Sequence, residues 1–133
     1  MSDPHILFEP IKYLEFEDVH PNGNLIHPML ASANTVICMI QANFCGYCTE
    51  AKPAFQKFAD KNRDIICVTV QGDAKDDRGN RINEELITKL MGDRDFGYPT
   101  YIKYVHGERQ HDEIEDRTIK GLEKFANIRN QYY

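Results

Sequence analysis

Residues 35–48 read TVICMIQANFCGYC, a branched apolar run followed at once by two cysteines three positions apart. Residues 35–42 are nearly all apolar, which predicts a strand buried on both faces. Beyond the cysteines, apolar residues recur at helical spacing over residues 47–61. The stretch therefore predicts a strand that ends where a helix begins, with Cys45 and Cys48 at the junction.

The spacing of Cys45 and Cys48 suits thiol–disulfide exchange, because one thiol can attack a disulfide and the other can release the product. A thiol at the start of a helix meets the positive end of the helix dipole and free backbone N–H groups, which favour the thiolate. We therefore expect Cys45 to be the nucleophile. Cys48, one turn further into the helix, is expected to be more buried and to act second, by attacking the mixed disulfide at Cys45.

The rest of the chain alternates between strand-like and helix-like segments. Branched residues predict a second buried strand, and a polar loop, residues 72–81, follows it. The predicted strands are 11–16, 64–70 and 100–105 with a hairpin partner at 109–114, and the predicted helices are 28–33, 82–91 and 118–128. Together these segments predict an α/β protein with one domain over residues 1–133, in which residues 1–34 fit the pattern least.

The composition of the chain limits the classes of partner that it can bind. Its 133 residues are 41% hydrophobic and 28% charged, as expected for one globular domain. The formal net charge of -5, with acids and bases interspersed, argues against a nucleic-acid partner. The longest apolar stretch is far short of the ~20 residues of a membrane span, and the amino terminus shows no secretory signal pattern. We expect no nucleic-acid or membrane partner and a cytoplasmic location.

Three separated features of the sequence resemble the thioredoxin-like family, that is, thioredoxin and protein disulfide isomerase-type domains, here with a Cys-Gly-Tyr-Cys active site. They are the paired cysteines at a strand-to-helix junction, Pro53 five residues after the second cysteine, and Tyr98-Pro99-Thr100 before a strand. The resemblance runs from about Thr35 to the end. It implies a thioredoxin-like fold, with a central mixed β-sheet flanked by helices. It also implies that the Tyr98–Pro99 bond is cis and faces the dithiol, and that the Tyr98 backbone pairs with an extended substrate.

Some residues depart from the family pattern. Phe44 stands where most relatives have tryptophan, and keeps an apolar ring for substrate beside the motif. Met39 stands where thioredoxins and disulfide isomerases carry a buried acid that helps to deprotonate the second cysteine. Glu50, the nearest acid in sequence, is expected to be exposed. Arg117 resembles the arginine that disulfide isomerases swing toward the site, so it is a candidate modulator of the thiol pKa.

The remaining cysteines and the histidines predict no further chemistry. Cys38 and Cys67 lie within apolar runs and are expected to be small buried hydrophobes. The five histidines form no compact zinc signature, and the acids of residues 72–79 lack the alternating oxygen ligands of a calcium loop. We therefore predict no metal site and no cofactor other than the dithiol itself, which an external reductase or oxidant would recycle.

Three functions fit these patterns. The leading interpretation is a thiol–disulfide oxidoreductase whose substrates are protein thiols and disulfides and whose recycling partner is a reductase or an oxidase. The second is a glutaredoxin-like enzyme linked to glutathione, although the Gly-Gly pair that glutaredoxins carry after the cis proline is absent from residues 101–104. The third is a non-catalytic binding module with a thioredoxin fold, an interpretation that Met39 favours.

Overall fold

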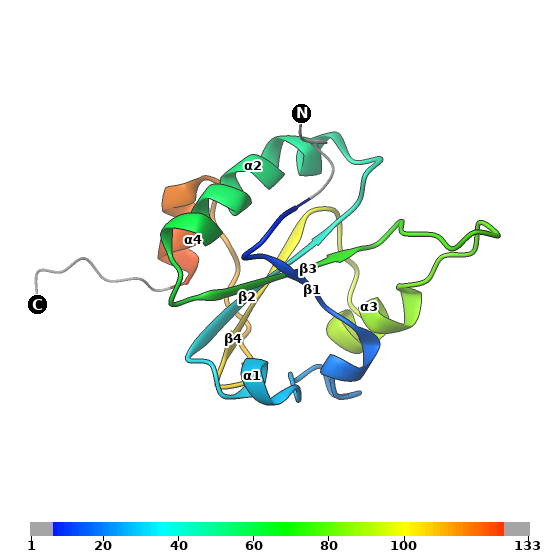
Figure 1. The fold of residues 1–133 in the computed structure, drawn as a ribbon, viewed down its shortest axis with the longest axis horizontal. Helices are drawn as coiled ribbons and strands as arrows, with labels where there is room; N and C mark the ends of the chain where they lie inside the picture. The colour runs from blue at the N-terminus through cyan, green and yellow to red at the C-terminus, as the bar shows by residue number, and fades with distance from the viewer. Residues whose placement is uncertain (1–6, 127–133) are drawn as a thin grey trace, which may run out of the picture.

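The computed structural model describes residues 7–126. In it a five-stranded sheet separates two layers of helices (Figure 1). The strands are β1 (Lys12–Tyr13), β2 (Thr35–Gln41), β3 (Ile66–Gln71), β4 (Thr100–Val105) and β5 (Glu108–Arg109). The helices are α1 (Pro28–Ala31), α2 (Gly46–Lys61), α3 (Glu84–Met91) and α4 (Ile119–Phe125), with a short 3-10 helix η1 (Phe16–Asp18).

The sheet has the spatial order β1-β3-β2-β4-β5. β3 runs parallel to both β1 and β2, whereas β4 runs antiparallel to β2 and β5. The predicted α/β class and the central mixed sheet flanked by helices are therefore confirmed. Because β2 and β3 are parallel, their carboxyl ends meet at one edge of the sheet, and the two cysteines follow β2 at that edge.

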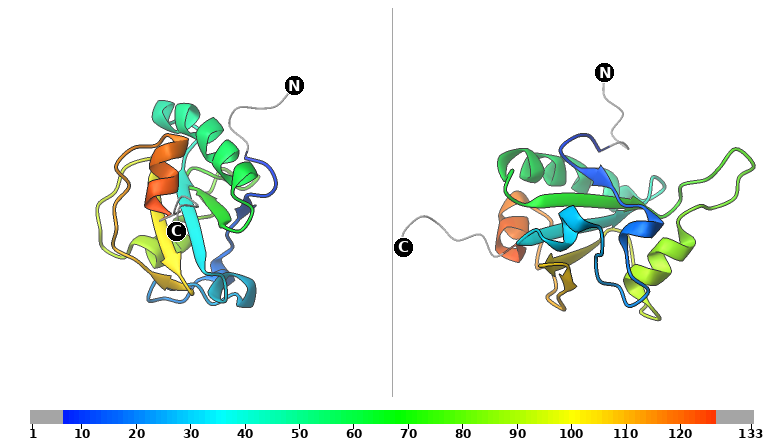
Figure 2. Two further views of the ribbon diagram at one scale, coloured as in Figure 1. Left: turned by 90° about the vertical axis from the view of Figure 1, so that its left-hand side faces the viewer. Right: turned by 60° about the horizontal axis from the view of Figure 1, so that its bottom comes forward.

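Alternate residues of β2 face the two helical layers. Ile37 and Met39 pack with the apolar face of α2 and with α4, while Val36, Cys38 and Ile40 pack with α1 and α3. The views in Figure 2 show these layers on opposite sides of the sheet. Both faces of β2 are thus buried, as its unbroken apolar run predicts. This double burial fixes the register of β2 and with it the position of the cysteines that follow.

Two predicted strands are shorter in the structure. The hairpin partner predicted at residues 109–114 is only the two-residue β5, paired through Tyr104–Arg109 and Val105–Glu108. From Gln110 to Glu113 every side chain is polar or charged, so the segment has no apolar face to hold it against the sheet. The prediction of a six-residue strand there is wrong.

The strand predicted at residues 11–16 also ends early, since only Lys12 and Tyr13 pair with β3. Glu15 and Asp18 form a capping box after this strand. The Asp18 carboxylate accepts the Glu15 N–H at 2.9 Å, and the Glu15 side chain accepts the backbone N–H of Asp18. These local hydrogen bonds begin η1 in place of further strand. The last helix is α4 from Ile119, capped by Thr118, and the end predicted at residue 128 lies outside the described residues.

The polar loop predicted at residues 72–81 forms a narrow hairpin that extends away from the body of the molecule (Figure 1). Ile82 N–H donates to the Ala74 carbonyl at 3.1 Å, which closes the base of the hairpin. At the tip, Asp76 accepts the backbone N–H groups of Arg78 and Asn80, both at 2.9 Å. The Asp76 carboxylate is thus engaged by the turn itself.

Candidate active site

Cys45 caps the amino terminus of α2, as its position after the buried strand predicts. Its Sγ accepts the backbone N–H of Cys48 at 3.1 Å, and its thiol donates to the Tyr98 carbonyl at 3.4 Å. The Cys45 residue is 9% exposed, whereas Cys48 is fully buried behind it. All four cysteines are free in this structure. Of Cys45 and Cys48, Cys45 is the thiol that a partner can reach.

The surroundings of Cys48 favour its protonated form. Burial raises the pKa of the Cys48 thiol to about 12, and the hydrogen bond to Cys45 acts in the same direction. Two smaller effects oppose this rise: a hydrogen bond with the Ala42 backbone and the positive charge of Lys52. Cys48 therefore stays a neutral thiol at neutral pH until its surroundings change.

The Tyr98–Pro99 peptide bond is cis and lies against the dithiol, as the resemblance implies. The Tyr98 ring contacts two other aromatic rings edge to face: Phe44 at 5.6 Å and Phe96 at 5.5 Å between centroids. Phe44 is 67% exposed and Phe96 is 37% exposed, so the rings form an apolar rim beside Cys45. Phe96 was not predicted from the sequence, although an aromatic residue two positions before Tyr98 is a usable signal.

Arg117 lies against the motif rather than against the sulfurs. Its guanidinium sits 5.6 Å from the centre of the Tyr47 ring, in a cation–π contact. Arg117 and Tyr47 are both exposed, and Arg117 directly precedes the cap of α4. The structure thus brings Arg117 to the motif through Tyr47, and its effect on the thiols stays a prediction.

The interior behind the dithiol contains a buried lysine, Lys52, and an apolar residue at position 39. Met39 is fully buried in the core between the sheet and α2, and Glu50 is exposed, as predicted. Lys52 is only 1% exposed, and its Nζ donates to Asn43 Oδ1 at 3.1 Å. The helical spacing predicts Lys52 on the polar face of the helix, and its burial shows that this prediction is wrong. The position of Lys52, four residues after Cys48, was the available signal of burial.

Asp73 holds the segment that leads to Cys45. Its carboxylate accepts the N–H of Asn43 at 3.0 Å, the N–H of Phe44 at 3.2 Å and the Gln71 side-chain amide at 3.1 Å. Partial burial alone would raise the pKa of Asp73, but the hydrogen bonds from Asn43, Gln71 and Phe44 outweigh it and lower the pKa. Sequence reasoning missed this residue too, because β3 delivers it to the active-site edge from thirty positions away.

No protein-family model matches the chain. The chain is similar to a viral protein, the thioredoxin-like protein 453L of Invertebrate iridescent virus 6. The two are 36% identical over 134 residues, and the match covers 92% of this chain and 91% of the relative. The chain belongs to the thioredoxin-like family. The resemblance seen in the sequence is thereby confirmed.

Solved structures agree with this fold for the thioredoxin-like protein. The zinc-bound form of human ERp44 superposes with a TM-score of 0.65 at 18% identity, covering 88% of this chain and 30% of the ERp44 chain. Thioredoxin f from spinach chloroplast superposes with a TM-score of 0.60 at 15% identity, covering 88% of this chain and 84% of that one. At these identities the superpositions show the fold alone.

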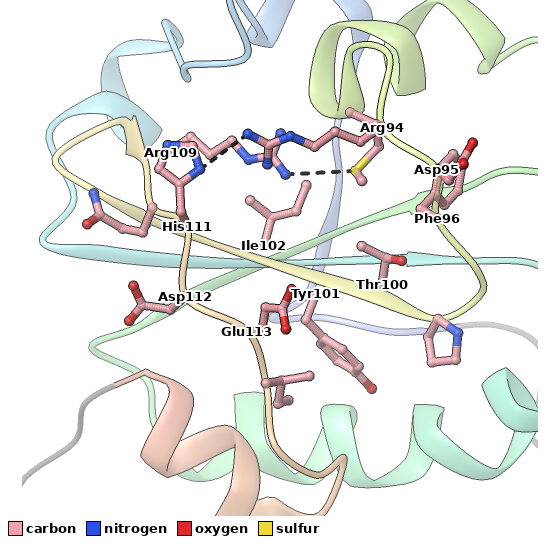
Figure 3. A pocket seen from close by; sticks show the side chains of 14 residues that line it. Arg94, Asp95, Phe96, Thr100, Tyr101, Ile102, Arg109, His111, Asp112 and Glu113 are labelled. Carbon is pink, nitrogen blue, oxygen red and sulfur yellow. Dashed lines mark hydrogen bonds between the residues drawn. The ribbon is translucent and has the colours of Figure 1, made fainter.

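A pocket of about 340 Å³ extends from Pro99 along β4 toward β5 of the thioredoxin-like protein (Figure 3). Two arginine side chains that line this pocket form hydrogen bonds with neighbouring segments. Arg109 donates to the Leu90 carbonyl near the end of α3, and Arg94 Nη2 lies 3.3 Å from His111 Nδ1. The first contact links β5 to α3, and the second links the segment between α3 and Pro99 to the segment after β5.

Residues 7–126 contain neither a group of metal-binding side chains nor a membrane-spanning helix. Within that range no three His, Cys, Asp or Glu side chains are grouped so that they could hold a metal ion. None of the helices described there is long and apolar enough to cross a membrane.

Removing the Asp73 carboxylate is expected to destabilise the thioredoxin-like protein. Asp73→Ala leaves the N–H groups of Asn43 and Phe44 without their acceptor and should cost about 1–2 kcal/mol at pH 7. Because the pKa of Asp73 is lowered by folding, its contribution is present above the unfolded pKa and is lost as pH falls through the folded pKa. Urea unfolding from pH 7 down to pH 3 measures this.

Asp77→Ala is the matched control, since Asp77 is an exposed acid on the same hairpin. It should change stability by less than about 0.5 kcal/mol at every pH. A difference between wild type and Asp73→Ala that stays constant down to pH 3 would contradict the role given to the Asp73 charge.

Proposed function

We propose that this chain is a thiol–disulfide oxidoreductase that acts on protein thiols and disulfides. The observation that carries the proposal is the geometry of the dithiol. Cys45 caps α2, where the N–H of Cys48 reaches its sulfur, and the fully buried Cys48 thiol is hydrogen-bonded to it from behind. An accessible sulfur with a second sulfur in contact is the arrangement that disulfide exchange requires.

In the proposed reaction, the Cys45 thiolate attacks one sulfur of a substrate disulfide. A Cys45–substrate disulfide forms, and the other substrate sulfur leaves as a thiol after taking up a proton. Cys48 then attacks the Cys45 sulfur, which forms the Cys45–Cys48 disulfide and releases the second substrate thiol. The substrate gains two electrons and the protein loses them, and a reductase restores the pair. The same steps in reverse would oxidise a substrate dithiol, with an oxidase as the recycling partner.

The surface around Cys45 supports a protein substrate. The exposed rings of Phe44 and Phe96 offer apolar area on one side, and the backbone of Tyr98 offers a carbonyl beside Pro99. In the free protein that carbonyl accepts the Cys45 thiol. An extended substrate segment could replace this hydrogen bond with one from its own backbone N–H, whatever its side chains. We assign Phe44, Tyr98 and Pro99 to substrate binding on this basis.

The test is the redox potential of the Cys45–Cys48 pair. The protein is equilibrated with graded glutathione buffers, and thiols are counted by mass after alkylation. We expect a reversible two-electron transition between about -270 mV, the value of thioredoxin, and about -120 mV, that of the strongest oxidant of this fold. A potential near about -270 mV would indicate a reductant, and a potential near about -200 mV or above would indicate an oxidase or isomerase.

Cys48→Ser is the control, because it removes the internal disulfide and should instead retain one glutathione on Cys45. If no reversible Cys45–Cys48 disulfide forms at any potential in the series, the proposed function is wrong. The non-catalytic binding module, with Met39 in place of the acid, would then be the better account. A pair that turns over with glutathione but not with a protein disulfide would favour the glutaredoxin-like alternative.

A further inference from the structure

We propose that Lys52 is a positioning residue that stabilises the Cys48 thiolate during release of substrate, in place of the buried acid that Met39 replaces. The inference rests on the proposed function, since it concerns the second step of that reaction. It identifies a buried cation, rather than a carboxylate, as the group that helps Cys48 to react.

The placement of Lys52 supports this role. Lys52 follows Cys48 by one turn of α2, so the two side chains share one face of the helix, with β carbons about 5–6 Å apart. Both are buried: Cys48 is 0% and Lys52 is 1% exposed. Helical side chains lean toward the amino terminus, and Lys52 Nζ reaches Asn43 Oδ1 at 3.1 Å, in the segment just before Cys45. The ammonium therefore lies at the segment that leads into Cys45, one helical turn from the Cys48 position.

The hydrogen bond with the Ala42 backbone also lowers the pKa of Cys48, but no other side chain near Cys48 offers comparable help. Met39 is apolar, and Glu50 is exposed on the outer side of α2. The phenols of Tyr98 and Tyr101 lie within electrostatic reach, but burial raises the pKa of both, so both are neutral at pH 7. The charge of Lys52, in contrast, lowers the pKa of Cys48 against the larger effect of burial.

The step itself balances without an external acid or base. Cys48 gives up its proton and attacks the Cys45 sulfur of the mixed disulfide, so that the Cys45–Cys48 bond forms and the bond from Cys45 to the substrate sulfur breaks. The departing substrate thiolate takes up the proton. Negative charge thus develops on the Cys48 sulfur before the new bond forms, and a nearby ammonium in a site shielded from water stabilises that charge.

Lys52→Met is expected to lengthen the life of the mixed disulfide about tenfold. Loss of the ammonium reduces the thiolate fraction of Cys48, and the higher nucleophilicity of a more basic thiolate compensates only in part. The first attack, by Cys45, should keep its rate. The pH at which release of substrate speeds up should also rise, because a more basic thiol needs a higher pH to ionise.

The experiment mixes the reduced protein with glutathione disulfide, quenches with acid at successive times and measures the Cys45–glutathione adduct by mass, from pH 6 to pH 9. Lys57→Met is the matched control, since Lys57 is an exposed lysine on the same helix, and it should behave as wild type. Lys52→Arg, which keeps the charge, should restore fast release. A purely structural role for Lys52 would change stability without changing the ratio of the two rates.

The outcomes separate this inference from the proposed function. If the adduct never forms, even in Cys48→Ser, the proposed function fails. If it forms and is released at the same rate in wild type and in Lys52→Met, or if Lys52→Arg behaves like Lys52→Met, the role given to the Lys52 charge is wrong. Should Lys52→Met fail to fold, Lys52→Gln gives the same comparison, because it removes the charge and keeps a polar donor on a somewhat shorter side chain.

Discussion

Serine in place of Cys45 is expected to lower the rate of protein disulfide reduction by about a thousandfold or more, because a hydroxyl does not ionise at neutral pH and cannot form the mixed disulfide. Insulin reduction by dithiothreitol, followed by the turbidity of the released chain, measures the loss. Cys45 caps α2 through its side chain, and serine is also a good cap, so the fold should be retained.

Cys67→Ala is the control for this loss, because Cys67 is a buried thiol in β3, remote from the motif, and it should remain close to wild type in rate. Cys48→Ser should react once and then hold the substrate on Cys45. Residual turnover of Cys45→Ser above a tenth of the wild-type rate would show that another thiol attacks, and would remove Cys45 from the proposed role.

Truncation of Phe55 to alanine is expected to destabilise the protein by about 3–5 kcal/mol. Phe55 is fully buried on the face of α2 that packs against the sheet. Its ring centre lies 6.5 Å from that of Phe58 and 6.1 Å from that of Tyr101, so the substitution opens a cavity between helix and sheet. Guanidinium chloride unfolding of the reduced protein, followed by far-ultraviolet circular dichroism, measures the change.

Phe8→Ala is the matched control for truncation, since the Phe8 residue is 47% exposed. It should cost less than about 1 kcal/mol. A similar loss in both variants would mean that the packing of α2 on the sheet contributes less than its burial indicates. The comparison also bears on function, because the same helix carries Cys45 and Cys48 at its first turn.

Local patterns in the sequence were sufficient for the fold class and the dithiol. The apolar run of β2, the helical spacing of α2 and the two cysteines between them predicted the junction, since each depends on neighbours within a few positions. Elements without such a pattern were predicted poorly. The strand predicted at residues 109–114 was too long, because burial against the sheet, and not strand propensity, decides where a weak strand such as β5 ends.

The spacing of residues along the chain was enough to predict the buried strand, the helix that follows it and the place of Cys45 and Cys48, and the family resemblance implied the cis bond at Pro99. The surroundings of these groups depend on tertiary contacts. Asp73 reaches Asn43 and Phe44 because two parallel strands end at the same edge, and Lys52 is buried because α2 lies with that face on the sheet. Burial and contacts between distant segments set the pKa values of the thiols, and neither can be predicted from the spacing of residues along the chain.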